Sequence, residues 1–265
     1  MKTNYHTHTT RCMHASGSDE EYVRSAIKGG YQVLGFSDHT PWQYHSDYVA
    51  DMRMLPEELP DYIESLRSLR EKYRGQIEIK IGLECEYFPD YIYWLKEQVK
   101  MYRLDYIIFG NHHYHTDEKF PYFGHHTNNL DMLNLYEESA IEGMESGLFS
   151  YLAHPDLFMR SYPAFDSHCI STSRQICRTA ARLNLPLEYN IGYVAYNLAH
   201  GLSTYPCAEF WRIAANEGCT AIIGLDAHFN VDLEIPIYYD QATQVLKRLG
   251  IKTIDTLEML TDKAG

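Results

Sequence analysis

The chain has 265 residues, enough for one α/β barrel. Its 45% hydrophobic and 22% charged residues are typical of a globular protein and exclude a disordered chain or a coiled coil, while a net charge of −13 would repel a phosphate backbone and disfavours nucleic-acid binding. No apolar run is long enough to span a bilayer and the opening MKTNYHTHTT lacks the apolar core of a signal peptide, so we expect a cytoplasmic protein that has no membrane partner.

Strand and helix patterns alternate along the whole chain. Ser18 and Glu21 form a capping box before a helix that ends at Gly29 and Gly30, and the buried strand VLGFS follows. Further helices are predicted at about 56–73, 91–101, 129–146, 171–183 and 207–217. The strands between and after them are IEIKIGLE, YIIFG, FSYLAH, PLEYN and TAIIGLD. With the opening TNYH this makes seven strand-then-helix units, and the last stretch, TQVLKRLG and IKTIDTL, is expected to close the set.

This alternation predicts a parallel sheet, because each crossover helix returns the chain to the same end of the sheet. A barrel and a doubly wound sheet both satisfy that rule. No GxGxxG follows the first strand, and seven units exceed the number in a dinucleotide-binding fold. We therefore predict a single-domain α/β barrel over residues 1–265.

Every predicted strand ends in residue types that bind metals. One such histidine is more often an ordinary polar residue than a ligand. Seven consecutive strand ends of this kind are different, because the carboxyl ends of barrel strands converge on one mouth, where barrel enzymes place their active sites. The pattern therefore predicts a metal site at the mouth, drawn from strand ends that carry His6 and His8, Asp38 and His39, Glu84 and Glu86, His112 and His113, His154 and Asp156, Glu188 and Asn190, and Asp226 and His228.

The donor types also indicate the metal and the chemistry. The six cysteines contain no CxxC pair and are expected to be reduced thiols, so the site offers imidazole and carboxylate, which suit zinc, manganese or iron. About nine candidate ligands, at three or four per ion, favour two or three ions. Clustered ions lower the pKa of a shared water and clamp the oxygens of a phosphoryl group, which favours hydrolysis.

The sequence resembles a known family along nearly its whole length. The segment HTHTTRCMHASGSDEEYVRSAIKGGYQVLGFSDH is similar to the opening of the polymerase-and-histidinol-phosphatase (PHP) superfamily, in particular of its monofunctional histidinol-phosphate phosphatases. GLECEYF, FGNHHY, LAHPDLF, LEYN and GLDAH follow in the order and spacing of that family's later motifs. The resemblance implies a distorted (β/α)7 TIM-like barrel.

The resemblance also implies a ligand set. A first metal would be held by His6, His8, Glu84 and Asp226, a second by His14, His39 and His228, and a third by Glu84, His113 and His154. Among these residues, Glu84, Asp226 and His228 are the implied catalytic ones. At FGNHHY the family pattern favours His113, while His112 remains the alternative. His14 owes its place to the resemblance, because a histidine in a loop is more often solvated.

A phosphate monoester also needs a cationic fork for oxygens that the metals leave free. Arg160, four residues after Asp156, and Arg11, close behind HTHT, are the candidates. The chain departs from its family after EYN, where IGYVAYNLAHG lacks the basic residue that relatives often carry. We expect Asp38 and Asp156 to orient ligand imidazoles rather than to bind metal.

The implied activity is hydrolysis of L-histidinol phosphate to L-histidinol and phosphate in histidine biosynthesis, by a metal-activated hydroxide that attacks phosphorus. The alternative is a phosphoesterase of the same superfamily that acts on a nucleotide or sugar phosphate. A polymerase-associated domain and a non-catalytic metal-binding module are the other classes; the acidic, free-standing chain disfavours the first. The expected partner is a small phosphate monoester, and nothing in the sequence specifies an oligomeric state.

Overall fold

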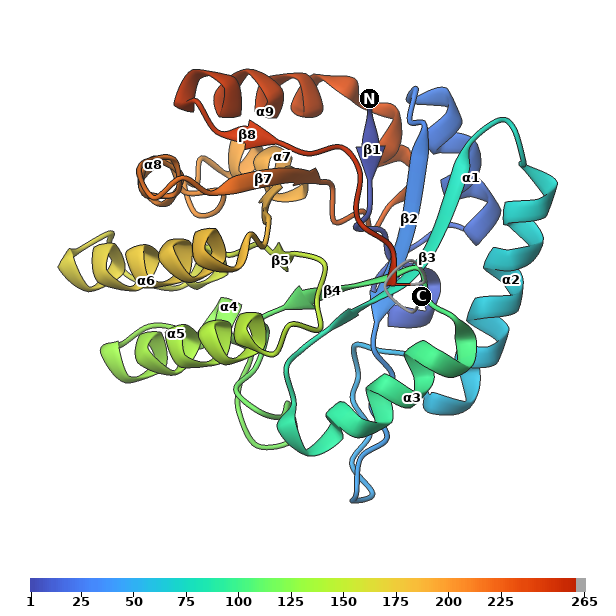
Figure 1. The fold of residues 1–265 in the computed structure, drawn as a ribbon, viewed down its shortest axis with the longest axis horizontal. Helices are drawn as coiled ribbons and strands as arrows, with labels where there is room; N and C mark the ends of the chain where they lie inside the picture. Colours follow the sequence, from blue (N-terminus) through green and yellow to red (C-terminus); the bar gives the residue numbers. More distant parts are fainter. Residues whose placement is uncertain (261–265) are drawn as a thin grey trace.

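The computed structural model describes residues 1–260 and contains one curved sheet of eight parallel strands in sequential order. Helices surround the strands, which radiate from the centre of Figure 1. The strands are β1 (Thr3–Asn4), β2 (Val33–His39), β3 (Glu78–Cys85), β4 (Tyr106–Gly110), β5 (Leu152–Ala153), β6 (Leu187–Asn190), β7 (Thr220–Gly224) and β8 (Lys252–Thr253). The predicted α/β fold of the TIM-like barrel type is confirmed.

The helices return the chain from one strand to the next on the outside of the sheet. They are α1 (Asp19–Lys28), α2 (Leu59–Lys72), α3 (Ile92–Tyr102), α4 (Phe123–His126), α5 (Leu130–Glu145), α6 (Ser167–Leu183), α7 (Gly192–His200), α8 (Ala208–Asn216) and α9 (Pro236–Leu249). Short 3₁₀ helices are η1 (Thr10–Cys12), η2 (Pro56–Glu58), η3 (Pro89–Tyr91), η4 (Leu157–Arg160) and η5 (Asn230–Glu234). No helix within residues 1–260 is both long and apolar enough to pass through a membrane.

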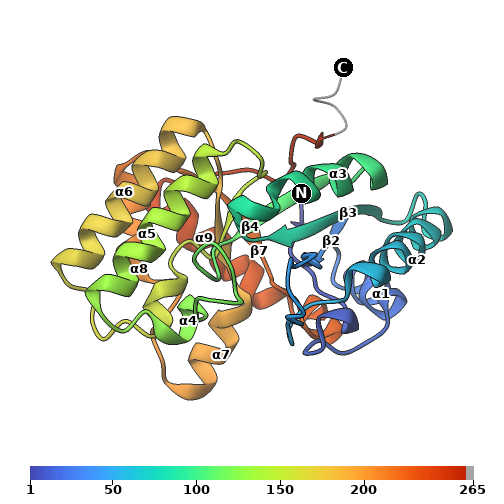
Figure 2. The ribbon, with the colours of Figure 1, turned by 90° about the horizontal axis from the view of Figure 1, so that it is seen from below.

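Most predicted helices agree with the structure, and the differences have local causes. The predicted capping box of α1 is present, since the Ser18 side chain accepts from the Glu21 amide and Glu21 accepts from the Ser18 amide. Helix α6 begins four residues earlier than the predicted 171, because Asp166 caps it by accepting from the amides of His168 and Cys169. Helices α4 and α7 were not predicted, and Figure 2 shows α7 projecting from the lower edge of the molecule.

The sheet closes at its carboxyl end, and the closing contact differs from the predicted one. Thr7 pairs with Ala227 in a parallel bridge, in which the His8 amide donates to Ala227 O at 2.9 Å. Strand β8 was expected to close the barrel, but it pairs with β7 only at Thr220 and Ala221, at the amino end. The mouth is therefore closed by the segments that carry the first and last predicted ligands.

A small apolar cluster fills the barrel beneath the mouth. Tyr106 belongs to this cluster, and its hydroxyl oxygen lies 2.7 Å from Tyr5 O and 2.9 Å from Phe36 O, either of which can accept its single proton. Gly35 makes room for it, since a Cβ there would lie 2.4 Å from the Tyr106 hydroxyl oxygen. A larger cluster joins the sheet to the outer helices. The polar side chains at the strand ends consequently lie on an apolar floor.

Candidate metal centre

The carboxyl ends of the strands open into one cavity of about 670 Å³. This volume suits a small ligand. Its inner wall carries metal-ligand types, namely His14, His39, Glu84, His112, His154, Asp226 and His228. Its outer wall is aromatic and charged, and includes Asp51, Tyr122, Arg160, Tyr193, Tyr196, Tyr205 and Asp232. The topology thus brings residues more than two hundred positions apart into one site.

The first group of donors surrounds Asp226. His8 Nε2 lies 3.1 Å and His6 Nε2 3.3 Å from Asp226 Oδ1. The same two nitrogens lie 3.5 Å and 3.4 Å from the Glu84 carboxylate. Both are buried and have no hydrogen-bond partner among the described residues. Buried polar atoms without partners are rare, and a cation that both imidazoles and both carboxylates bind would satisfy them.

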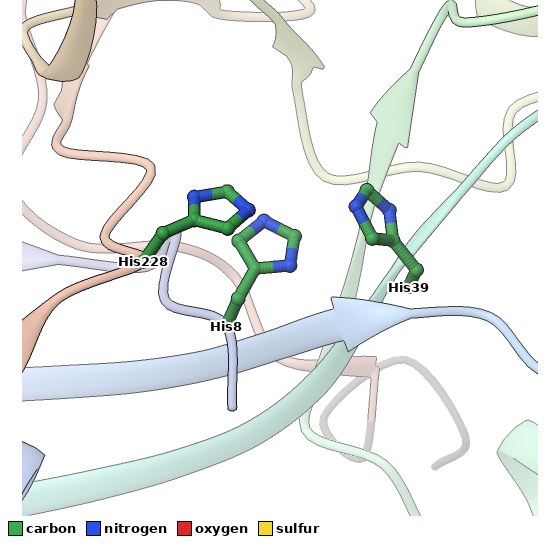
Figure 3. Close-up of side chains that lie close together, drawn as sticks. All are labelled: His8, His39 and His228. Atoms are coloured by element: carbon green, nitrogen blue, oxygen red, sulfur yellow. The ribbon is translucent and has the colours of Figure 1, made fainter. Parts of the chain in front are cut away.

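The second group is a set of facing imidazoles, three of which appear in Figure 3. The His8 ring lies between those of His228 and His39, with centroids 4.2 Å and 4.4 Å away. These three residues each offer a nitrogen within 4.8 Å of the others. His14 completes the group, with Nε2 2.9 Å from His228 Nε2, and His39 Nδ1 lies 3.1 Å from Glu84 Oε2. Glu84 therefore faces both groups.

The third group contains Glu84, His154 and His112. The Nε2 atoms of His154 and His112 lie 3.0 Å and 3.3 Å from Glu84 Oε1 and 3.3 Å from each other. His113 does not line the cavity, and its Nδ1 lies 2.9 Å from Phe120 O. The choice of His113 over His112 is therefore corrected, because the turn after β4 directs the first histidine to the cluster and the second into the following loop.

Gly110, at the end of β4, makes this third group possible. A Cβ at this position would lie 2.5 Å from Glu84 Oε1 and 2.6 Å from His112 Cε1. Real Cβ atoms essentially never approach that closely. Only a residue without a side chain lets the carboxylate and the imidazole meet over the strand end.

Carboxylates hold the outward Nδ1 atoms of several imidazoles, so that Nε2 points to the cluster. Glu188 accepts from His6 at 2.7 Å, Glu86 accepts from His112 at 3.0 Å, and Asp38 faces His8 at 3.5 Å. This arrangement is typical of metal-binding histidines. The sequence placed Glu86 and Glu188 at strand ends without identifying this task. The two-residue spacing between Glu84 and Glu86 could have indicated this role for Glu86. Residues two apart on a strand project to the same face, so both side chains face the site from β3 and its extension.

Asp38 and Asp156 were both expected to orient imidazoles, and only Asp38 does. Its Oδ2 also accepts from the Thr9 amide at 3.1 Å. Asp156 instead accepts from the Cys207 amide at 2.5 Å. It ties the segment before α8 to η4, and the expectation for Asp156 is corrected.

The charges of the cluster divide its imidazoles into two sets. Although burial opposes it, neighbouring carboxylates raise the pKa of His6 and His154 and raise that of His8 to about 9, so that these imidazoles would release a proton when a metal binds. Burial, followed by the positive charge of His8, lowers the pKa of His39 to about 3 and that of His228 to about 4. Burial alone would raise the pKa of Asp226, but the positive charges of His6 and of the adjacent His8 outweigh it and hold this pKa well below its usual value. Neutral imidazole and ionised carboxylate are the forms that bind metals.

Of the two predicted phosphate-binding arginines, only Arg160 lines the cavity. Its guanidinium carbon lies 5.0 Å from the Tyr193 ring centre and 5.8 Å from that of Tyr122. Within residues 1–260 no carboxylate forms an ion pair with Arg160, and its polar contact is a 3.5 Å hydrogen bond to the Tyr122 hydroxyl. Aromatic faces therefore hold the cation and leave most of its donors free for an anion.

Arg11 lies outside the cavity and is already neutralised. Its guanidinium pairs with Asp19 at 3.0 Å and with Asp61 at 2.9 Å. The structure therefore does not bring the second predicted phosphate ligand to the site. The segment after EYN, which lacks a basic residue, forms α7 and contributes Tyr193, stacked on Tyr205 with ring centres 4.3 Å apart.

Comparisons with a family model and with known proteins agree on the family to which this chain is similar. The family model described as PHP domain matches residues 4–192. A probable histidinol-phosphatase of Deinococcus radiodurans is 28% identical over 259 residues and is covered over 94% of each chain. A probable histidinol-phosphatase of Schizosaccharomyces pombe is 25% identical over 295 residues, covering all of this chain and 92% of the yeast protein.

Two solved structures share the fold. The histidinol phosphate phosphatase of Lactococcus lactis, in complex with zinc, L-histidinol and phosphate, has a TM-score of 0.74 at 17% identity, with 97% of each chain covered. The putative histidinol phosphatase of Listeria monocytogenes has a TM-score of 0.69 at 18% identity, covering 87% of this chain and 97% of that one. At these identities the likeness supports the barrel architecture.

Proposed function

The chain belongs to the PHP domain family, and on that premise we propose that it is a metal-dependent phosphomonoesterase that hydrolyses L-histidinol phosphate to L-histidinol and phosphate. The observation that carries the proposal is the set of imidazole and carboxylate donors that surrounds Glu84 and Asp226 at the base of one cavity, with Arg160 on the outer wall. Relatives named histidinol-phosphatase, which align over 92% or more of their own length, support the substrate. We propose that residues 1–265 act as one such domain in the cytoplasm.

The proposed metal ligands are those that face the cluster. His6, His8, Glu84 and Asp226 would hold one ion, His14, His39 and His228 a second, and Glu84, His112 and His154 a third. Zinc, manganese and iron suit this mixture of imidazole and carboxylate. Divalent ions bound here would act as Lewis acids that lower the pKa of a water molecule and polarise the phosphoryl oxygens.

The remaining residues of the site would bind and orient the ester. The Arg160 guanidinium would donate two parallel hydrogen bonds to phosphoryl oxygens that face away from the ligand cluster. Tyr193 and Tyr205 would enclose the ester and limit the access of bulk water. Asp51 and Asp232 on the outer wall suit the ammonium group of L-histidinol phosphate better than an anionic nucleotide.

Phosphate release from a panel of monoesters tests the proposal. The protein is first assayed for zinc, manganese and iron, and histidinol phosphate is then compared with sugar phosphates and nucleoside monophosphates. We expect histidinol phosphate to have the highest kcat/KM. Preference for a sugar phosphate or nucleotide would support the alternative phosphoesterase, and bound metal without turnover of any ester would indicate a non-catalytic module.

A further inference from the structure

A buried cation lies behind the proposed metal ligands, outside the cavity. Arg53, 2% exposed, belongs to the long segment between β2 and α2. Its guanidinium donates to Thr40 O at 2.9 Å, to both oxygens of Glu86 at 3.0 and 3.1 Å, and to Asp117 Oδ2 at 2.9 Å. A planar fork with several donors is required to reach all of these acceptors at once. Such a buried arrangement costs desolvation energy, which calls for a specific reason.

Glu86 is the point at which this network meets the ligand cluster. Its Oε2 also accepts from Trp42 Nε1 at 2.8 Å, and its Oε1 lies 3.0 Å from His112 Nδ1. An ionised carboxylate can only accept, so His112 must carry its proton on Nδ1. The Nε2 lone pair of His112 then points to Glu84 and His154, each 3.3 Å away.

The same guanidinium connects the two loops that carry ligands. Thr40 directly follows His39, and Asp117 lies in the loop that begins at His112. Asp117 also accepts from the Tyr44 hydroxyl at 2.7 Å, which ties it back to the segment that contains Arg53. Without the guanidinium, Glu86 and Asp117 would be buried carboxylates with fewer donors and would turn or take up a proton.

We propose that Arg53 is a positioning residue: by holding Glu86 as an oriented acceptor, it sets the tautomer and direction of His112 and thereby the metal affinity of the Glu84, His112 and His154 group. The inference rests on the proposed metal site but not on the identity of the substrate. An ammonium would replace one or two of the contacts of the fork and leave the others open.

Zinc binding by the Arg53→Lys variant tests this inference. Both variant and wild type are stripped of metal and titrated with zinc against a competing chelator. Loss of an orienting contact of this kind typically costs about 10- to 100-fold in metal affinity, and we expect that loss for one zinc equivalent while the others keep their affinity. With histidinol phosphate, kcat should fall because fewer molecules hold the ion of this group, while KM measured in excess zinc should change by less than about threefold, because Arg53 itself does not contact the ester.

Arg70→Lys is the matched control. Arg70 pairs with Asp105, which accepts from the Ile81 amide on the same strand β3, and neither Arg70 nor Asp105 lines the cavity. Arg70 is 36% exposed and Arg53 only 2%, so thermal unfolding of both variants is measured beside the titration to separate a loss of stability from a loss of binding. The loss of zinc affinity should appear only in Arg53→Lys. Equal zinc affinities in Arg53→Lys and wild type would overturn the proposal.

A second measurement needs no folded Arg53 variant. Nitrogen-15 NMR of the imidazoles in metal-free wild type at pH 8, with His112 assigned by its absence in His112→Gln, should show the proton on Nδ1. A proton on Nε2 would overturn the proposal, as would a wild type that binds no zinc. If zinc affinity depends on Arg53 but histidinol phosphate is not hydrolysed, the proposed substrate fails and the positioning role stands.

Discussion

Replacing Arg160 with lysine separates phosphate recognition from metal binding. The guanidinium lies against the rings of Tyr122 and Tyr193 and contacts none of the imidazoles of the cluster within hydrogen-bonding distance. Lysine keeps the positive charge, but its ammonium is a point donor and cannot form two parallel bonds to a phosphoryl group. The substitution therefore removes geometry rather than charge.

The expected fall in kcat/KM follows from the hydrogen bonds that the Arg160 guanidinium makes. The Arg160 guanidinium has a hydrogen bond to the Tyr122 hydroxyl, and at 3.5 Å this bond is long and weak. Few of its donors are therefore engaged by the protein, and the others are free to bind the phosphoryl group of an ester. A hydrogen bond to a charged group contributes about 1.5–3 kcal/mol, and lysine would retain one of the two. A loss of about 2 kcal/mol in transition-state binding corresponds to about a thirtyfold fall in kcat/KM.

The assay is steady-state phosphate release from histidinol phosphate, with metal content measured on the same preparation. Arg11→Lys is the control, because Arg11 is held by Asp19 and Asp61 outside the cavity, and its kcat/KM should stay within about twofold of wild type. Unchanged kcat/KM in Arg160→Lys would refute the phosphate role. A fall in metal content would show instead that Arg160 supports the ligand cluster.

Three further predictions concern the cluster itself. Elemental analysis after repletion should find more than one equivalent of zinc, manganese or iron, since three donor groups meet at Glu84; one equivalent or less would contradict this. His112→Ala should lose metal and most turnover while His113→Ala keeps both, and the reverse order would restore the sequence-based choice. Gly110→Ala should lower zinc affinity in a chelator competition, because a Cβ there collides with the Glu84 carboxylate and the His112 ring; an unchanged affinity would show that the strand end yields.

Local patterns in the sequence were sufficient to predict the strands, most of the helices and the end of the barrel at which the site lies. Strands buried on both faces must be continuous apolar runs, as in β2, and amphipathic helices must repeat apolar residues on one face, as in α1. Helix α7 was not predicted because it has neither a buried residue nor a side-chain cap, and it therefore lacks both an apolar face and a capping signal in the sequence.

The tertiary structure decided which of the candidate residues meet. Whether His112 or His113 faces Glu84 depends on the turn that follows Gly110, and adjacent residues of the same type carry no local difference that settles it. The sequence position of Arg11 made it a reasonable candidate for a phosphate ligand. In the folded chain its guanidinium instead pairs with Asp61, which is fifty positions away in the sequence.

The tertiary structure also decides how the imidazoles are oriented. His6 is directed by Glu188, 182 positions away in the chain, and His112 by Glu86, which Arg53 holds from a third segment. Residue types at strand ends determine that a polyhistidine–carboxylate site exists, because each strand end contributes its own side chains independently. Which nitrogen points inward is determined by partners that only the closed barrel brings together, since a hydrogen bond requires contact in space and not proximity in sequence.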